Sequence, residues 1–224
     1  MHRITVSLPQ EREYEGWLAR EIEDYFLALG QTVYVFVISQ HREKDDPADI
    51  WFEFQNKGAE GKLIGLQLKR PYLLNHKRPP FEQLYWEFDD PPGQLEKVKA
   101  SDEIFYCLPT FLNRAYRRIS LHHCIFWRPD ESDRPTSGWY DERPKNASMK
   151  IKKRNKTKLG SEERWGRFVE GITRCTHGGE WRNAEVLRAR IRELVAAWHD
   201  KSMTSDEALL MFAVQKPSTR AKRK

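Results

Sequence analysis

Two polar side chains, Gln67 and Lys69, alternate with apolar residues in the segment KLIGLQLKR at 62–70. Alternate residues of a β-strand point to the same face, so Gln67 and Lys69 would lie side by side, opposite the leucines. A polar side chain within an apolar strand costs free energy unless that face is wet or binds a ligand. The acid Asp49 opens the preceding apolar segment, ADIWFEFQ at 48–55. We expect Asp49, Gln67 and Lys69 to meet on neighbouring strands.

Phosphodiester hydrolysis is the chemistry that such a trio supports. A divalent cation polarises the phosphoryl oxygen and activates water, and Mg²⁺ is bound by hard oxygen ligands. Asp49 and the Gln67 amide oxygen would supply ligands to Mg²⁺ or Mn²⁺. Lys69 would orient the water and offset the charge that develops on the phosphate.

The elements that would position this trio follow a simple order of helix, three strands, helix and strand. Apolar side chains at helical spacing predict the first helix, and β-branched and aromatic runs predict the strands. The glycines of NKGAEG predict a hairpin between the second and third strands. We expect these elements at residues 11–29, 32–40, 48–55, 62–70, 93–101 and 103–108.

This order of elements, with Asp49 before Gln67-Leu68-Lys69, resembles the PD-(D/E)XK nuclease superfamily. It is most similar to the variants in which Gln replaces the acid of the ExK element. The resemblance covers about residues 11–108. It implies an α/β fold with a mixed sheet, a restriction-endonuclease-like αβββαβ core, and a magnesium-dependent endonuclease acting on DNA.

The sequence departs from the family pattern at two points. The PD element is Ala48-Asp49, with Pro47 one position early. Gln67 is neutral, so the site carries one negative charge fewer, which should weaken metal binding and leaves open whether one ion or two are bound.

Relatives in this superfamily often carry a further acid on the first helix, and Glu15 is the candidate here. Its phase places it within the apolar stripe that packs on the sheet, where a carboxylate needs a partner such as a metal ion. Glu11 lies on the same face but at the frayed end, so it is the second choice. Glu53 is a spare ligand candidate, and Gln94 matches a Gln that some relatives carry near the site.

Basic residues interleaved with aromatics are expected to contact nucleic acid. The net charge is +6, and Lys and Arg gain by displacing counterions from a phosphate backbone. The resemblance favours DNA, and it also suggests a homodimer or a partner protein. The residues proposed to bind nucleic acid are Arg70, Tyr72, Lys77, Arg78, Lys152, Lys153 and Arg154.

The remaining chain is expected to extend and flank this core. A helix near 110–118 and a strand near 121–127 would complete the core, and the proline-containing segment 71–92 would be a structured loop. The last helices are expected near 161–174, 180–199 and 204–214. The predicted regions are a nuclease core at 1–128, a polar and basic linker or loop at 129–160, a helical region at 161–214 and a basic tail at 215–224.

Other classes of function have weaker support in the residues. Three cysteines, an odd number, argue against a disulfide framework and favour the cytoplasm; no apolar run suits a membrane span. Zinc at the groups 122–124 and 175–177 is disfavoured by their spacing, and the absence of a phosphate-binding loop disfavours an intrinsic ATPase. Two alternatives stay open: a non-catalytic nucleic-acid-binding or assembly module, and a defence or mobile-element nuclease that a partner activates.

Overall fold

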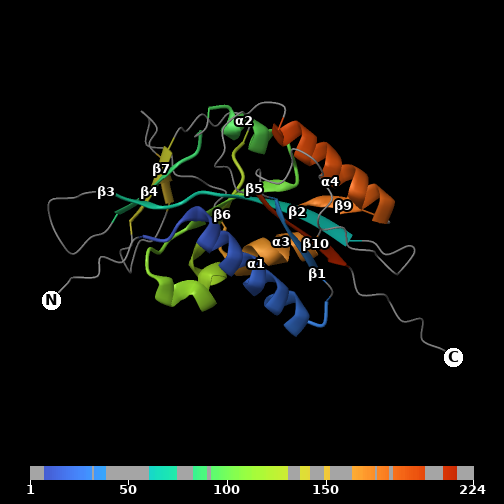
Figure 1. Cartoon of the computed structure of the whole chain (residues 1–224), viewed down its shortest axis with the longest axis horizontal. Helices are drawn as coiled ribbons and strands as arrows, with labels where there is room; N and C mark the ends of the chain where they lie inside the picture. Colours follow the sequence, from blue (N-terminus) through green and yellow to red (C-terminus); the bar gives the residue numbers. More distant parts are fainter. Residues whose placement is uncertain are drawn as a thin grey trace.

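The computed structural model shows a mixed α/β protein with two sheets (Figure 1). It describes residues 8–31, 33–38, 61–74, 83–89, 92–130, 137–141, 149–151, 163–174, 176–181, 184–199 and 209–215. The α-helices are α1 (Glu11–Ala28), α2 (Gln94–Lys99), α3 (Trp165–Thr173) and α4 (Ala184–His199), and the 3₁₀ helices are η2 (Arg114–Arg118) and η3 (Ser120–His123). The strands are β1 (Val33–Ile38), β2 (Gly61–Leu68), β3 (Tyr72–Leu74), β4 (Gln83–Glu87), β5 (Ile104–Pro109), β6 (Cys124–Trp127), β7 (Ser137–Asp141), β8 (Met149–Ile151), β9 (Gly179–Trp181) and β10 (Leu209–Gln215).

The main sheet has the order β1-β10-β2-β5-β6, and β9 pairs with one end of β2. β10 runs antiparallel to both β1 and β2, whereas β2 and β5 are parallel. Helices α1 and α3 cover one face, and α2 and α4 cover the other (Figure 1). β2 is therefore a central strand, and all eight of its residues are buried.

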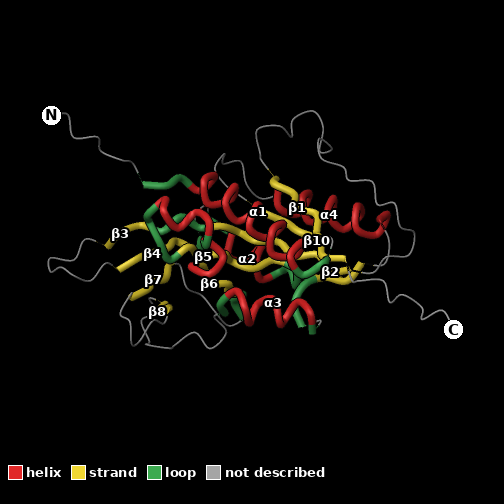
Figure 2. The backbone as a smooth tube through the Cα atoms, turned by 90° about the horizontal axis from the view of Figure 1, so that it is seen from below, coloured by secondary structure: helices red, strands yellow, loops and turns green. Residues whose placement is uncertain are grey.

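A smaller sheet with the order β3-β4-β7-β8 lies at one end of the molecule (Figure 2). It is not separate from the main core, because Leu84 and Trp86 of β4 are buried in the same cluster as Tyr106 of β5 and Trp127 of β6. The described part of the chain contains no helix long and apolar enough to cross a membrane.

Helix α1 forms where the apolar spacing predicts it. Tyr14, Leu18, Ile22 and Phe26 recur every four residues, so they share one face, and each is almost completely buried. At the N-terminus, the Gln10 backbone N–H donates to the Glu13 carboxylate at 2.9 Å, as in a capping box. α1 therefore lies along the sheet with its first turn at a fixed place.

Several elements agree with the sequence-based predictions. Strands β1, β2, β5 and β6 and helices α1, α2, α3 and α4 fall within or close to their predicted ranges. The segment expected to be helical near 110–118 contains the 3₁₀ helix η2. The predicted strand 48–55 lies outside the described residues.

Three predictions of secondary structure were wrong. The segment 71–92, predicted as a loop, contains β3 and β4, and the segment 129–160, predicted as a linker or loop, contains β7 and β8. The segment 204–214, predicted as a helix, contributes β10. Leu, Met and Ala favour helices locally, but pairing with strands on both sides overrides this weak preference.

The position of β10 also corrects two topological expectations. β10 pairs with β2 from Gly61 to Gln67, and β5 and β9 occupy its other edge. The backbone positions that a hairpin with 48–55 would use are therefore already paired. Because β10 belongs to the main sheet, that sheet is not confined to the region 1–128.

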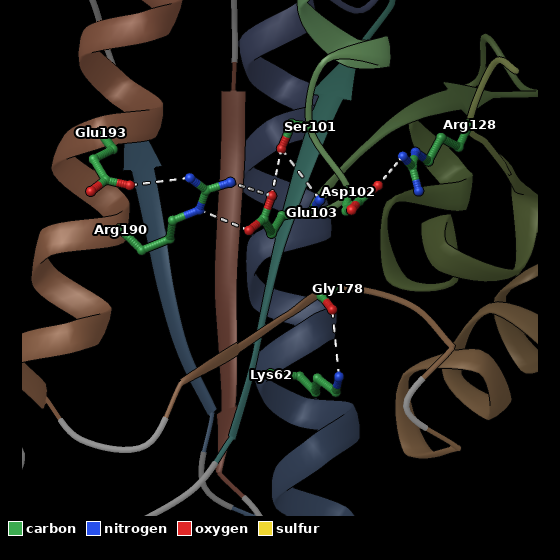
Figure 3. Close-up of polar contacts among 8 residues, drawn as sticks. All are labelled: Lys62, Ser101, Asp102, Glu103, Arg128, Gly178, Arg190 and Glu193. Atoms are coloured by element: carbon green, nitrogen blue, oxygen red, sulfur yellow. Dashed lines mark hydrogen bonds and ion pairs between the residues drawn. The ribbon is translucent and has the colours of Figure 1, made fainter. Parts of the chain in front are cut away.

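A polar network fastens α4 to the start of β5 (Figure 3). Arg190 on α4 donates from Nε and Nη2 to the two oxygens of Glu103, at 2.8 and 2.9 Å. Ser101 Oγ donates to the same carboxylate at 2.7 Å. Burial raises the pKa of Glu103. The hydrogen bonds from Arg190 and Ser101, together with the positive charge of Arg190, lower it by more, so the pKa falls below its ordinary value.

Replacing Arg190 with methionine should lower the free energy of unfolding by about 2 kcal/mol, because the Glu103 carboxylate, with a side chain only 8% exposed, loses its cation. Urea denaturation at neutral pH measures this loss. Glu193→Gln is the matched control, because Glu193 is exposed and also pairs with Arg190; its loss should be under about 0.5 kcal/mol. Equal losses in the two variants would contradict a specific role for the buried pair.

Candidate active site

Lys69 and Arg70 leave the central strand β2 at its carboxyl end. The Lys69 backbone N–H still donates to the Cys107 carbonyl of β5, at 3.2 Å. Lys69 is only 8% exposed. A lysine this deep needs negative charge nearby, because an isolated buried ammonium group is strongly disfavoured.

The first turn of α1 is attached to the same end of the sheet. Arg70 Nη1 donates to the Gln10 side-chain oxygen at 2.9 Å. The Arg70 backbone N–H hydrogen-bonds to the Glu11 carboxylate. Further along α1, the Tyr14 hydroxyl donates to the carbonyl of Phe111, which follows β5, at 2.7 Å. These contacts fix the carboxyl groups of the first turn relative to the end of β2.

Two carboxyl groups, Glu11 and Glu15, occupy one face of α1 at this point, because residues four apart on a helix are neighbours. Burial raises the pKa of Glu11 to about 7, while Lys69 and Arg70 lower it and Glu15 raises it. Burial also raises the pKa of Glu15 to about 7, against a lowering effect of Arg12. Glu15 is 6% exposed. Glu11 therefore lies close to both Lys69 and Glu15, and Glu15 is buried on the face of α1 that its helical phase predicted.

This donor set suits a hard divalent cation. Mg²⁺ takes one or two protein carboxylates and retains several waters. Glu11 and Glu15 offer two neighbouring carboxylates in which burial outweighs the effect of the nearby cations, so the pKa of each stays raised. Within the described ranges there is no group of three or more His, Cys, Asp or Glu side chains that could hold a metal ion. Asp49 and Glu53 lie outside those ranges.

Gln67 occupies a different environment from Glu15. It is in register with Tyr106, which is buried in the core beneath α2, whereas Leu66 and Leu68 pack in the core beneath α1. Side chains alternate along a strand, so Gln67 points away from α1. The face of β2 that carries Gln67 was expected to be polar and hydrated, but it is packed against the core beneath α2. No described contact joins Gln67 to Glu15, and metal binding by Gln67 stays a prediction.

The Gln67 amide is nevertheless only half satisfied. It is fully buried, and its Nε2 donates to the Leu68 carbonyl at 3.1 Å. Its Oε1 has no hydrogen-bond partner among the described residues, and neither amide atom of the fully buried Gln94 has one there. A buried polar atom without a partner costs free energy and calls for a water, ion or ligand. Gln94 lies at the start of α2, which covers the same face as Gln67.

The residues predicted to bind nucleic acid are placed in part. The Arg70 guanidinium carbon lies 4.7 Å from the centre of the Tyr72 ring, a cation–π contact, and Tyr72 is 39% exposed. Arg70 directly follows Lys69, and Tyr72 comes two residues later. The other predicted residues, Lys77, Arg78, Lys152, Lys153 and Arg154, lie outside the described part of the chain.

The disfavoured zinc groups do not come together in the part of the chain that is described. His177 Nε2 is 2.8 Å from the Glu163 carboxylate, an ordinary ion pair or hydrogen bond. His123 packs against Tyr116 instead, with ring centres 4.6 Å apart. Cys124 is buried next to Cys107, and Cys175 is outside the described residues.

The structure makes Glu11 a stronger candidate for the site than the sequence did. The helical phase placed it on the correct face, but its position in the first turn suggested a frayed end. The hydrogen bond from the Arg70 backbone removes that objection, because it fixes the carboxylate to the end of β2. This contact joins residues far apart in the sequence, so no local pattern could have shown it.

The raised pKa values predict how stability changes with pH. Between about pH 4.5 and 7 the folded state keeps protons on Glu11 and Glu15 that the unfolded state has lost, so their contribution to stability falls as pH rises. Each unit of pKa difference is worth about 1.4 kcal/mol. Urea denaturation from about pH 5 to pH 8, without divalent cations, should show a steeper loss in the wild type than in Glu11→Gln/Glu15→Gln. Parallel curves would contradict the raised values.

The chain matches no protein-family model, no curated protein and no solved structure. The site therefore has to be judged on its own residues: two carboxyl groups on the first helix, a buried lysine at the end of a central strand, and the arginine that follows it.

Proposed function

We propose that this chain is a metal-dependent nuclease that hydrolyses phosphodiester bonds, with DNA as its substrate. One observation carries the proposal: Glu11, a neighbour of Glu15 on α1, lies close to the buried Lys69 at the carboxyl end of β2. Carboxylates suit a divalent cation, and a neighbouring lysine suits the phosphate that the cation holds. The pattern that resembles PD-(D/E)XK nucleases includes the same Lys69.

Each residue has a distinct role in this proposal. Glu11 and Glu15 would hold Mg²⁺ or Mn²⁺, and Asp49, predicted as a ligand from the sequence, would complete the set. The bound cation would supply Lewis acidity and an activated water. Lys69 would stabilise the negative charge that develops on the phosphate, and Arg70 would keep Glu11 in place through its backbone N–H.

Cleavage assays test the proposal directly. Supercoiled plasmid and single-stranded circular DNA should be cut by the wild type with Mg²⁺ or Mn²⁺, and a chelator should stop the reaction. Asp49→Ala should cut both substrates much more slowly than the wild type does. A wild type that leaves both substrates intact with either cation would overturn the proposed activity. Equal cleavage by the wild type and Asp49→Ala would remove Asp49 from the site.

A second candidate is a non-catalytic module that binds nucleic acid or assembles with a partner. One observation favours it: Gln67 stands where the family pattern has an acid, and its amide is fully buried and bonded to its own strand. Such a module would bind DNA without cutting it, and it would bind no divalent cation in an Asp49-dependent way.

A further inference from the structure

The segment that follows β5 presents exposed arginines and apolar side chains together. We call residues 114–119, with the sequence RAYRRI, the 114–119 platform. Tyr116 is 37% exposed and Ile119 is 44% exposed. Arg117 and Arg118 are also exposed, between these two side chains. The segment therefore presents an aromatic ring and an aliphatic side chain to solvent on either side of two arginines.

Helix α1 holds both ends of this platform. At one end, Arg114 donates from Nε and Nη2 to the two oxygens of Glu13, each at 2.7 Å. At the other end, the backbone N–H groups of Ser120 and Leu121 donate to the two oxygens of Glu21, each at 2.8 Å. In Figure 1 the platform is part of the light-green segment beside the N-terminal half of α1. The residues between these anchors are thus presented outward from a fixed base.

The Tyr116 ring is supported from within the protein. Its centre lies 4.6 Å from that of His123 and 5.7 Å from that of Phe111, at steep interplanar angles. These contacts hold the ring in one orientation while more than a third of the residue remains exposed. A ring that is already ordered can stack on a ligand with little further loss of entropy.

The charge of the platform is not balanced by its neighbours. Arg114 is paired with Glu13, and this pairing lowers the pKa of Glu13. No acidic side chain in the described part of the chain forms an ion pair with Arg117 or Arg118. The platform therefore carries two positive charges that face solvent next to an aromatic ring.

The platform lies at the same edge of the sheet as the candidate active site. β2 and β5 are parallel neighbours, so Lys69 and the segment leading to Arg114 leave the sheet at the same edge. The first turn of α1 binds both exits, because Gln10 accepts from Arg70 and Glu13 accepts from Arg114. A chain of phosphates held at Lys69 could continue onto the platform.

We propose that the 114–119 platform binds a single strand of nucleic acid, with phosphates at Arg117 and Arg118 and a base stacked on Tyr116. That the bound strand is also the substrate of the enzyme rests on the proposed function. Base stacking requires unpaired bases, and a duplex would meet only the arginines, so the exposed Tyr116 and Ile119 favour a single strand. The contacts depend on backbone charge and stacking, which predicts little preference for base sequence.

Binding without cleavage tests this proposal. Fluorescence anisotropy of a labelled single-stranded oligonucleotide and of its duplex should be measured with a chelator present. Tyr116→Ala should weaken single-strand binding about tenfold, whereas Tyr116→Phe should bind like the wild type. Arg117→Ala/Arg118→Ala should lower the slope of log K against log salt by roughly 0.7 for each arginine. Arg167→Ala/Arg174→Ala, which removes one exposed arginine of α3 and the exposed arginine directly after it, is the charge-matched control and should keep the wild-type slope.

Three results would overturn the platform: no binding of either nucleic acid by the wild type, tighter binding of the duplex than of the single strand, or equal losses in the platform and control variants. These results are independent of the nuclease assay. A wild type that binds through the platform but never cuts would refute the activity alone. A wild type that cuts, with unchanged binding in the platform variants, would refute the platform alone.

Discussion

Lys69→Met is expected to lower magnesium-dependent cleavage by about a thousandfold, because removing one preorganised charge at a phosphate costs about 10²- to 10³-fold in rate. The lysine is 8% exposed and lies close enough to lower the pKa of Glu11. Methionine keeps most of the volume of the side chain and removes its charge. The measurement is the initial rate of plasmid nicking under saturating Mg²⁺.

Lys97→Met provides the matched control for this prediction. Lys97 on α2 is 9% exposed, nearly as buried as Lys69, but it lies on the helix that covers the other face of the sheet. We expect its cleavage rate to stay within about twofold of the wild type, since it is not on the helix that carries Glu11 and Glu15. A loss of activity in Lys97→Met as large as that in Lys69→Met would indicate a general effect on folding, and the role assigned to Lys69 would fail.

Glu15→Gln should reduce activity and increase stability in the same protein. Without its second carboxylate the site should lose cation affinity, and cleavage at fixed Mg²⁺ should fall about a hundredfold. At pH 8 and without divalent cations, however, the free energy of unfolding should rise by about 2 kcal/mol, because the wild type must bury an ionised carboxylate there. The pKa of Glu15, raised to about 7 by burial, sets this sign. Cleavage kinetics and urea denaturation measure the two effects.

Glu23→Gln is the control on the same helix. Glu23 is exposed on α1, so its loss should change neither activity nor stability by much. A Glu15→Gln protein that is less stable than the wild type at pH 8 would show that the carboxylate has a structural partner. In that case Glu15 would not be available to a cation in the way we propose.

Local patterns predicted those parts of the fold that depend on local order. The four-residue spacing of Tyr14, Leu18, Ile22 and Phe26 defines α1, and the continuous apolar runs define β2 and β5. β10 could not be found in this way, because Leu209–Gln215 becomes a strand only between β1 and β2, far away in the sequence. The short strands of the second sheet depend in the same way on pairing between distant segments.

The candidate site was predictable to the extent that it depends on helix and strand phase. Helical phase identified Glu15 as a carboxylate on the buried face, and the strand pattern identified Lys69. The same alternation placed Gln67 and Lys69 on one face. However, β2 ends at Leu68, so Lys69 lies beyond the strand and near Glu11, whereas Gln67 faces a second core. The link between Arg70 and Glu11 arises from tertiary packing alone.

The most direct test of the account is a calorimetric titration of the protein with Mn²⁺ or Mg²⁺ at pH 7, carried out in two buffers with different ionisation enthalpies. Since Glu11 and Glu15 both have a pKa of about 7, cation binding should release roughly one proton. We predict saturable binding with this proton release in the wild type and in Glu23→Gln, and its loss in Glu11→Gln/Glu15→Gln. No binding by the wild type, or the same binding by the double variant, would contradict the site.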